Sequence, residues 1–144
     1  MNNRRVTEND YQKLVEVWER AVKKTHDFLQ VNDFQTIKVE LPTYFPHLEM
    51  NIWLIEERII GFSGMDGDKL EMLFLEPNDI GKGYGKKIVA TLIKKNQLRL
   101  IDVNEQNQSA RIFYQKMGFE EYARSEIDNA GRPYPILHLQ KNCI

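Results

Sequence analysis

The sequence contains little cysteine and no excess of charge of either sign. Its one cysteine, Cys143, stands next to the last residue, so no disulfide can form within the chain. Acidic and basic residues are interspersed and leave a formal net charge of −1. The lack of a basic surface argues against nucleic acid as a partner, and the lone thiol suits a reducing compartment. We do not expect Cys143 to act as a nucleophile.

Long apolar runs, internal repeats and low-complexity tracts are also missing. No apolar stretch approaches the ~20 residues that a membrane-spanning helix needs, and the start, MNNRRVTEND, lacks the apolar core of a secretion signal. We therefore expect a cytoplasmic protein without a membrane partner. The 144 residues fit one domain, residues 1–144, which is long enough to bury a sizeable core.

Hydrophobic periodicity predicts an α+β fold. Apolar residues recur at helical spacing after Thr7, a candidate N-cap, and again more loosely over residues 32–44. The runs NIWLIEE, IIGFSGM and KLEMLFLEP are typical of three antiparallel strands. A helix, a buried strand (LRLIDV), a second helix and two last strands follow. With a strand at the N-terminus, the expected order is strand, two helices, three strands, helix, strand, helix, two strands.

The loop DIGKGYGKK, residues 79–87, lies between a predicted strand and a predicted helix. Glycine at every second position from 81 to 85 leaves backbone N–H groups uncovered and free to converge on one anion. A helix that begins near Gly83 adds the positive end of its dipole, and Lys82 and Lys86 add cations. Phosphate is the natural ligand of such a loop. The alternative is a glycine-rich turn with solvated lysines.

Two well-known phosphate loops fit this spacing badly. A P-loop needs a glycine where Ile80 stands and a serine or threonine where Lys87 stands, so it is excluded. A dinucleotide fingerprint has a different glycine spacing and belongs to the first strand-helix turn of its unit. Asp102 lies about 20 residues further on, as a ribose-binding acid would, and this keeps a nicotinamide site open as an alternative.

Two segments resemble motifs of the GNAT superfamily of acetyl-CoA-dependent N-acetyltransferases. LFLEPNDIGKGYGKKIVATLI is similar to the acetyl-CoA segment, and VNEQNQSARIFYQKMGFE is similar to the second segment, Asn-x-x-Ala-x-x-Phe-Tyr-x-x-x-Gly-Phe. The stretches THDFL, VNEQN and GRPYPILHL are similar to a group of small bacterial acetyltransferases. The resemblance covers nearly the whole chain. Its one departure is Ile80, where the family usually has Gln or Arg, and weaker cofactor contacts are expected there.

The resemblance implies the GNAT fold, a three-layer α/β arrangement within the α+β class. A mixed, mostly antiparallel sheet of about seven strands carries helices on both faces, and its fourth and fifth strands splay into a V. In the family a bulge frees backbone groups of the fourth strand for the pantetheine arm, and the glycine loop holds the pyrophosphate of coenzyme A. The residues implied to bind the cofactor are Leu73, Phe74, Leu75, Gly81, Lys82, Gly83, Gly85, Lys86, Asn107 and Tyr114.

Tyr114 and Glu71 are the expected catalytic side chains. Tyr114 matches the family's proton donor to the coenzyme A sulfur, whereas its helical pattern alone indicates a core residue. The alternation of a strand groups Glu71 with Leu73 and Leu75, so Glu71 is a candidate base on the thioester side. The alternative is a rim carboxylate that attracts a cationic amine. Asn107 matches the cofactor-binding asparagine and is equally a candidate helix N-cap.

The acceptor cleft of the family lies between the segment after the first helix and the last hairpin. The residues implied to bind the acceptor are His26, Asp27, Phe28 and Tyr134, and a structural role for His26 stays open. His138 also borders this cleft, although its alternating strand indicates a half-buried structural residue. His47 follows Pro46 in a turn and is expected at the surface. No cluster of His, Cys and Asp has the spacing of metal ligands, so we expect no metal.

The resemblance implies an N-acetyltransferase that moves the acetyl group of acetyl-CoA to a primary amine of a small molecule or peptide, by direct attack in a ternary complex. The alternative is a non-catalytic acyl-CoA-binding sensor, for which Ile80 is the one hint. The expected partners are acetyl-CoA and the amine, with no nucleic acid and no membrane, and a homodimer stays open.

Overall fold

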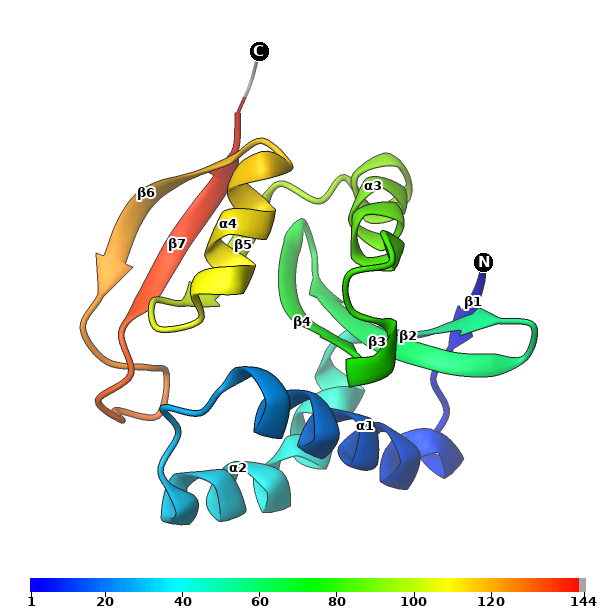
Figure 1. Ribbon diagram of the computed structural model, residues 1–144, viewed down its shortest axis with the longest axis horizontal. Coiled ribbons are helices and arrows are strands. Elements are labelled where there is room, and N and C mark those ends of the chain that lie inside the picture. Colours follow the sequence, from blue (N-terminus) through cyan, green and yellow to red (C-terminus); the bar gives the residue numbers. More distant parts are fainter. Residues whose placement is uncertain (143–144) are drawn as a thin grey trace.

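The order of elements in the computed structural model, which describes residues 1–142, confirms the predicted α+β fold (Figure 1). Cys143 lies outside the described residues. The helices and strands are β1 (Asn2–Arg5), α1 (Tyr11–Thr25), α2 (Val31–Tyr44), β2 (Glu49–Ile55), β3 (Arg58–Asp66), β4 (Lys69–Leu75), α3 (Tyr84–Asn96), β5 (Leu100–Asn104), α4 (Gln108–Lys116), β6 (Phe119–Ser125) and β7 (Ile136–Lys141).

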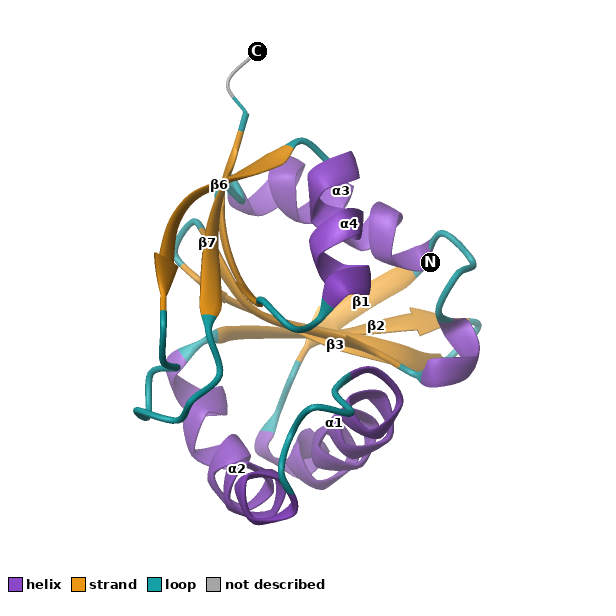
Figure 2. Cartoon of the chain, turned by 60° about the vertical axis from the view of Figure 1, so that its left-hand side comes forward, coloured by secondary structure: helices purple, strands orange, loops and turns teal. Residues whose placement is uncertain are grey.

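The strands form one seven-stranded sheet in the order β1-β2-β3-β4-β5-β7-β6. Every neighbouring pair is antiparallel except β4 and β5, which are parallel. Helices α1 and α2 cover one face of the sheet, and α3 and α4 cover the other (Figure 2). Each helix pair buries its own apolar core against the sheet, so the molecule has the three predicted layers.

Helix α1 is positioned by its amphipathic face and by the turn before it. Leu14 and Trp18 lie in the core on one face of the sheet. Thr7 caps a short 3₁₀ turn, Glu8–Asp10, that leads into the helix, and the Asp10 carboxylate accepts the Thr7 N–H at 2.8 Å. Thr7 therefore caps this 3₁₀ turn, and α1 itself begins only at Tyr11, with Asp10 as its N-cap. None of the helices in residues 1–142 combines the length and apolarity needed to cross a membrane.

Strands β4 and β5 pair over only two residues before they separate. Lys69 pairs with Leu100 and Leu70 with Ile101, and no pairing follows within the described residues. This separation confirms the predicted V between the fourth and fifth strands. Its consequence is that one edge of β4 beyond Leu70 is not covered by a neighbouring strand.

A β-bulge in β4 reverses the side-chain alternation of the strand. Leu70 pairs with Met65 of β3, but Met72 pairs with Gly64, so Glu71 is an extra residue. Leu70 packs in the core below α3 and α4. Because of the extra residue, the side chains that face this core after the bulge are those of Leu73 and Leu75, not those of Met72 and Phe74.

The predicted faces of β4 were therefore wrong. Leu73 and Leu75 share a core with Leu70, whereas Met72 and Phe74 pack on the side of α1 and α2. Glu71 lines a cavity with Met72 and Phe74 and does not share the face of Leu73 and Leu75. The bulge is the physical reason, because unbroken alternation would have grouped Glu71 with both leucines.

Candidate active site

The arm of the V formed by β4 offers free main-chain groups. Glu76, just after the strand, donates its N–H to Ile60 of β3 at 2.8 Å. Since successive residues of a strand direct their backbone groups to opposite sides, Phe74 also faces β3 and Leu73 and Leu75 face the gap. An extended ligand that carries amide groups can pair with these two residues as an added strand does.

A cavity of about 510 Å³ lies beside this arm, between the glycine loop, the end of α1 and α4. We call it the loop cavity. All predicted cofactor residues except Lys82 line it, namely Leu73, Phe74, Leu75, Gly81, Gly83, Gly85, Lys86, Asn107 and Tyr114. Lys82 lies instead with its Nζ 3.7 Å from the buried carboxylate of Asp79.

The glycine loop has the geometry of an anion cradle. Gly81 and Gly83 both have a φ of 85°, and a β-carbon on either would meet no atom of residues 1–142 within 4 Å beyond its immediate chain neighbours. Gly83 is the N-cap of α3, whose first N–H groups therefore open onto the cavity that Lys86 also lines. These features fit a pyrophosphate group bound through backbone N–H groups.

Asp79 ties this loop to β3. Its carboxylate is 1% exposed and accepts hydrogen bonds from both terminal nitrogens of Arg58, at 2.8 and 3.0 Å. The hydrogen bonds from Arg58 lower the pKa of Asp79 and outweigh burial, which raises it. The loop is thus held by a charged pair from outside the loop cavity.

Tyr114 lies in the wall of the loop cavity, packed against the rings of Phe113 and Phe119 at centroid distances of 5.1 and 6.3 Å. Within residues 1–142 its hydroxyl makes no hydrogen bond. Burial raises the pKa of Tyr114, so the hydroxyl stays protonated and can donate a hydrogen bond into the cavity.

Asn107 is the N-cap of α4. Its Oδ1 accepts the Ala110 N–H at 3.2 Å, while its side chain also lines the loop cavity. The cap therefore uses the carbonyl oxygen, and the amide nitrogen, which has no partner among residues 1–142, can still donate a hydrogen bond. The two predicted roles of Asn107 are compatible.

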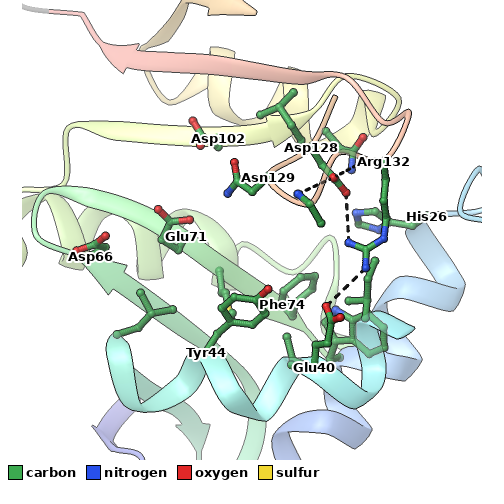
Figure 3. A pocket seen from close by; sticks show the side chains of 18 of the residues that line it. His26, Glu40, Tyr44, Asp66, Glu71, Phe74, Asp102, Asp128, Asn129 and Arg132 are labelled. Carbon is green, nitrogen blue, oxygen red and sulfur yellow. Dashed lines mark hydrogen bonds and ion pairs between the residues drawn. The ribbon is translucent and has the colours of Figure 1, made fainter. Parts of the chain in front are cut away.

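A second cavity, of about 580 Å³, lies on the opposite face of the sheet, between α1, α2, the arms of the V and the β6–β7 loop (Figure 3). We call it the acidic cavity, because five carboxylates line it against one guanidinium, that of Arg132. His26 and Phe74 line both cavities, so the two cavities meet at the V. The five carboxylates are Glu40, Asp66, Glu71, Asp102 and Asp128.

His26 is a neutral imidazole at this junction. The Thr25 hydroxyl donates to Ala21 O at 2.8 Å, so His26 Nδ1, 2.7 Å from the same hydroxyl, carries the proton and donates. Burial lowers the pKa of His26 to about 4, against the opposing charge of Asp27. His26 is therefore uncharged at neutral pH, with Nε2 as its acceptor.

The other predicted acceptor residues line neither cavity. Asp27 is exposed, and Phe28 packs between the rings of His26 and Tyr134, at centroid distances of 5.2 and 6.1 Å. The buried Tyr134 hydroxyl accepts the Gln30 N–H at 3.1 Å and donates to the Asp33 carboxylate. Phe28 and Tyr134 therefore support the wall around His26.

Arg132 closes one end of the acidic cavity. Its guanidinium lies 3.5 Å from the Glu40 carboxylate on α2 and 3.6 Å from that of Asp128 on the β6–β7 loop (Figure 3). It also lies 3.7 Å from the carboxylate of Asp33 on α2. We call this set of ion pairs the Arg132 clasp. Its single positive charge balances one of these three carboxylates, and Glu71 and Asp102 are the acidic groups at the V.

Glu71 and Asp102 approach one another from the two arms of the V. Lys69 Nζ lies 3.3 Å from Glu71 Oε1 and 2.6 Å from Asp102 Oδ2. Asp102 also contacts His138, which is half-buried as predicted. Two residues further along β5, Asn104 also lines the acidic cavity. Its Oδ1 is buried and has no hydrogen-bond partner among residues 1–142.

Sequence reasoning missed most of the acidic cavity. The sequence pattern indicates Asp102 only as a ribose-binding acid and assigns no role to Arg132 or Tyr44. The irregular apolar pattern of residues 32–44 was a usable signal, because a helix that lines a cavity lacks a clean buried stripe. His47, predicted at the surface, is exposed and stands at the cavity rim. Within residues 1–142 no group of three His, Cys, Asp or Glu side chains is arranged to hold a metal ion.

Comparisons with known proteins agree with this geometry. Residues 49–121 match the acetyltransferase (GNAT) domain family. The chain is 37% identical over 142 residues to the peptidyl-lysine N-acetyltransferase YjaB of Salmonella typhimurium, which covers 96% of this chain and 97% of the relative. It is 34% identical to YjaB of Escherichia coli, covering 94% and 93%.

Solved structures share the fold. The solution structure of apo-form YjaB from Escherichia coli superposes with a TM-score of 0.89 at 32% identity, covering 96% of this chain and 95% of that chain. The PaiA N-acetyltransferase from Thermoplasma acidophilum, solved in complex with coenzyme A, gives a TM-score of 0.70 at 20% identity and covers 98% of both chains.

Proposed function

Because the chain belongs to the GNAT family of acetyltransferases, we propose that it transfers the acetyl group of acetyl-CoA to the side-chain amine of lysine residues in peptides or proteins. The observation that carries this proposal is the meeting of the loop cavity and the acidic cavity at the V, where His26 and Phe74 line both. Two relatives named as peptidyl-lysine N-acetyltransferases, at 37% and 34% identity, support the choice of lysine. A sensor without activity is not favoured.

The loop cavity provides contacts for the pyrophosphate and the pantetheine arm of acetyl-CoA, which supplies a thioester that amines attack readily. The N–H groups at Gly83 and the start of α3, with Lys86, hold the pyrophosphate. The main-chain groups of Leu73 and Leu75 pair with the pantetheine amides. Ile80, which is 45% exposed and lines the same cavity, adds apolar contact where the family usually has a polar side chain.

The acidic cavity provides the acceptor side. A lysine ammonium must lose a proton before its nitrogen can attack, and Glu71 is the base in our proposal, directly or through water. The Leu73 N–H faces the gap and donates to the carbonyl oxygen as negative charge develops there. Tyr114 donates a hydrogen bond to the departing sulfur. Because the pKa of Tyr114 is raised, hydrogen-bond donation is favoured over full proton transfer.

The test is an acetylation assay with matched peptides. Purified protein is incubated with acetyl-CoA and an Nα-blocked peptide that contains one lysine, and coenzyme A release and peptide mass are followed. Control peptides carry norleucine in place of lysine, or a free N-terminus without lysine. We expect modification of the lysine peptide alone. Modification of the free N-terminus alone would overturn the lysine assignment. Thermal stabilisation by acetyl-CoA without turnover on any amine would favour a sensor.

A cytoplasmic location remains part of this proposal, since acetyl-CoA and reduced thiols suit that compartment. The acceptor and acetyl-CoA are its partners, and the proposal needs no metal. Fractionation of cells that express a tagged chain tests the location.

A further inference from the structure

Five polar side chains from four strands form a continuous chain of contacts behind the acidic cavity. The Ser125 hydroxyl is 2.8 Å from His138 Nε2, and His138 Nδ1 is 2.7 Å from Asp102 Oδ1. Asp102 Oδ2 is 2.6 Å from Lys69 Nζ, which lies 3.3 Å from Glu71 Oε1. We call these residues the polar chain. It crosses β6, β7, β5 and β4, and only its Glu71 and Asp102 line the acidic cavity.

The polar chain leaves net negative charge at the V. Burial alone would lower the pKa of Lys69, but the hydrogen bond to Asp102 and the charge of Glu71 outweigh it and raise the pKa. Lys69 therefore stays a cation and balances one of its two carboxylate neighbours. Its position at the first β4–β5 pair keeps both carboxylates at the point where the strands part.

His138 fixes Asp102 through a defined tautomer. An ionised carboxylate only accepts hydrogen bonds, so Nδ1 carries the proton, and Nε2 accepts the hydroxyl proton of Ser125. The Tyr122 ring, 6.3 Å away between centroids, is the aromatic neighbour of the imidazole. His138 does not line the acidic cavity, so any effect of this residue on the acceptor must pass through Asp102.

Glu71 and Asp102 differ in the hydrogen-bonding capacity that they leave free. Both oxygens of Asp102 already accept a bond from the protein. Glu71 contacts Lys69 through Oε1 alone, and among residues 1–142 its Oε2 has no partner. Glu71 is thus better placed to take a proton, and Asp102 is better placed to hold a fixed charge.

Asn104 gives an independent sign that a donor enters here. Its Oδ1 is a buried acceptor with no partner among residues 1–142, and each such atom needs an explanation. Asn104 follows Asp102 by two residues on β5, so their side chains share a face of the strand, and both line the acidic cavity. An N–H group between them would satisfy this oxygen.

We propose that Asp102 is a second acceptor-binding residue, which holds the incoming ammonium beside Glu71, and that His138, backed by Ser125, is its positioning residue. This inference rests on the proposed lysine acceptor. One N–H bond of the ammonium breaks and its proton forms an O–H bond on Glu71. Asp102 and Asn104 keep the two remaining N–H groups, and the released nitrogen lone pair points to the thioester.

The first test separates acceptor binding from donor binding. We expect Asp102→Asn to raise KM for the lysine peptide roughly tenfold to a hundredfold, because it removes a charged hydrogen bond. KM for acetyl-CoA should not change. Glu121→Gln, at an exposed position on β6 outside the polar chain, is the matched control and should behave as wild type. Equal lysine KM values in Asp102→Asn and wild type would overturn the inference.

His138 provides a second pair of variants. His138→Leu removes the hydrogen bond to Asp102 and should raise the lysine KM several-fold, whereas His138→Asn keeps an N–H donor near the position of Nδ1 and should restore much of the loss. A merely structural role would lower the melting temperature of both variants without this split in lysine KM. Equal KM values in the two variants, at similar melting temperatures, would overturn the positioning role.

A binding measurement keeps this inference separate from the proposed function. Nα-acetyl-lysine methylamide is titrated into ¹⁵N-labelled protein with coenzyme A present, and backbone amide signals of β4 and β5 are followed. We expect saturable shifts in the wild type and weaker binding in Asp102→Asn. Missing wild-type turnover would refute lysine acetylation, whereas missing binding, or equal binding by both proteins, would overturn the role of Asp102.

Discussion

Glu71 and Leu73 lie two residues apart on β4 and line cavities on opposite faces of the sheet. The extra residue at the bulge causes this arrangement, since an unbroken strand places such residues on one face. One short segment thereby gives a carboxylate to the acceptor and free main-chain groups to the acyl donor.

Glu71→Gln tests whether this carboxylate is the base or a rim residue. A base is needed only for the chemical step, so we expect kcat to fall roughly tenfold or more while KM for the lysine peptide changes little. Raising the pH should recover part of the loss, because more of the amine is then already neutral. Steady-state kinetics at several pH values provide the measurement. A higher peptide KM with wild-type kcat would assign Glu71 to the rim.

Tyr114→Phe isolates the hydroxyl in the loop cavity. The ring and its packing remain, and the missing hydroxyl has no partner among residues 1–142, so the melting temperature should hardly change. If the hydroxyl assists the departing sulfur, kcat should fall roughly tenfold to a thousandfold at nearly constant KM for acetyl-CoA. Tyr122→Phe, at an exposed tyrosine, is the control. A folded Tyr114→Phe protein with wild-type kcat, under conditions where chemistry limits the rate, would remove Tyr114 from the mechanism.

Gly83→Ala and Gly67→Ala form a matched pair for the cradle. Both glycines have positive φ, 85° and 60°, and at both a β-carbon would meet open space. Each alanine should cost about 1–2 kcal/mol of folding free energy through backbone strain. Only Gly83 borders the loop cavity, so only Gly83→Ala should raise KM for acetyl-CoA, by roughly tenfold. Similar KM values in the two variants would place the pyrophosphate elsewhere.

Arg58→Ala tests the anchor of the loop. The variant leaves the buried Asp79 carboxylate with Lys82 alone, so both the melting temperature and acetyl-CoA affinity should fall. Because Arg58 lowers the pKa of Asp79, its contribution to stability is present at neutral pH and disappears as the pH falls through the folded-state pKa. The melting temperatures of both proteins should therefore begin to converge as the pH falls below about 4, and should meet only below the lowered pKa of Asp79. A constant difference in melting temperature would contradict this account.

Because the pKa of His26 is lowered, we expect the free energy of unfolding to fall in acid. Its folded pKa of about 4 lies below its usual value of 6.5, so the unfolded chain binds more protons between these pH values. Stability should decline as the pH falls from 6.5 to 4, by on the order of 3 kcal/mol from this residue. We expect His26→Gln to flatten that decline and His47→Gln, at an exposed histidine, to leave it unchanged. Denaturant unfolding at a series of pH values measures both.

The elements and the glycine loop could be predicted because their signals are local. The period of apolar residues gave the helices and strands, and alternating glycines before an amphipathic helix gave the cradle. The two GNAT-like segments then gave the V, which no local pattern contains. The elements and the cradle depend on residues that are neighbours in the chain, whereas the V follows only from the resemblance.

The acidic side of the site could not be predicted in the same way. The bulge at Glu71 depends on how β3 and β4 pair, and no residue type within β4 indicates its position. Asp102 meets His138 across a separation of 36 residues, and His138 meets Ser125 across 13, through the non-sequential order β5-β7-β6. Motifs along the chain therefore identify the residues that bind acetyl-CoA more readily than those that bind the acceptor amine.

The short β4–β5 pairing also has a mechanical consequence. Strands β1 to β4 form one half of the sheet and β5 to β7 the other, and within the described residues the two halves pair directly only at Lys69 and Leu70. At the far end of the gap, the Arg132 clasp and the hydrogen bond from Tyr134 to Asp33 connect the β6–β7 loop to α2, which packs on the first half. The gap is therefore bounded by main-chain pairing at one end and by side-chain contacts at the other. Widening the gap at the loop end would require these side-chain contacts to break.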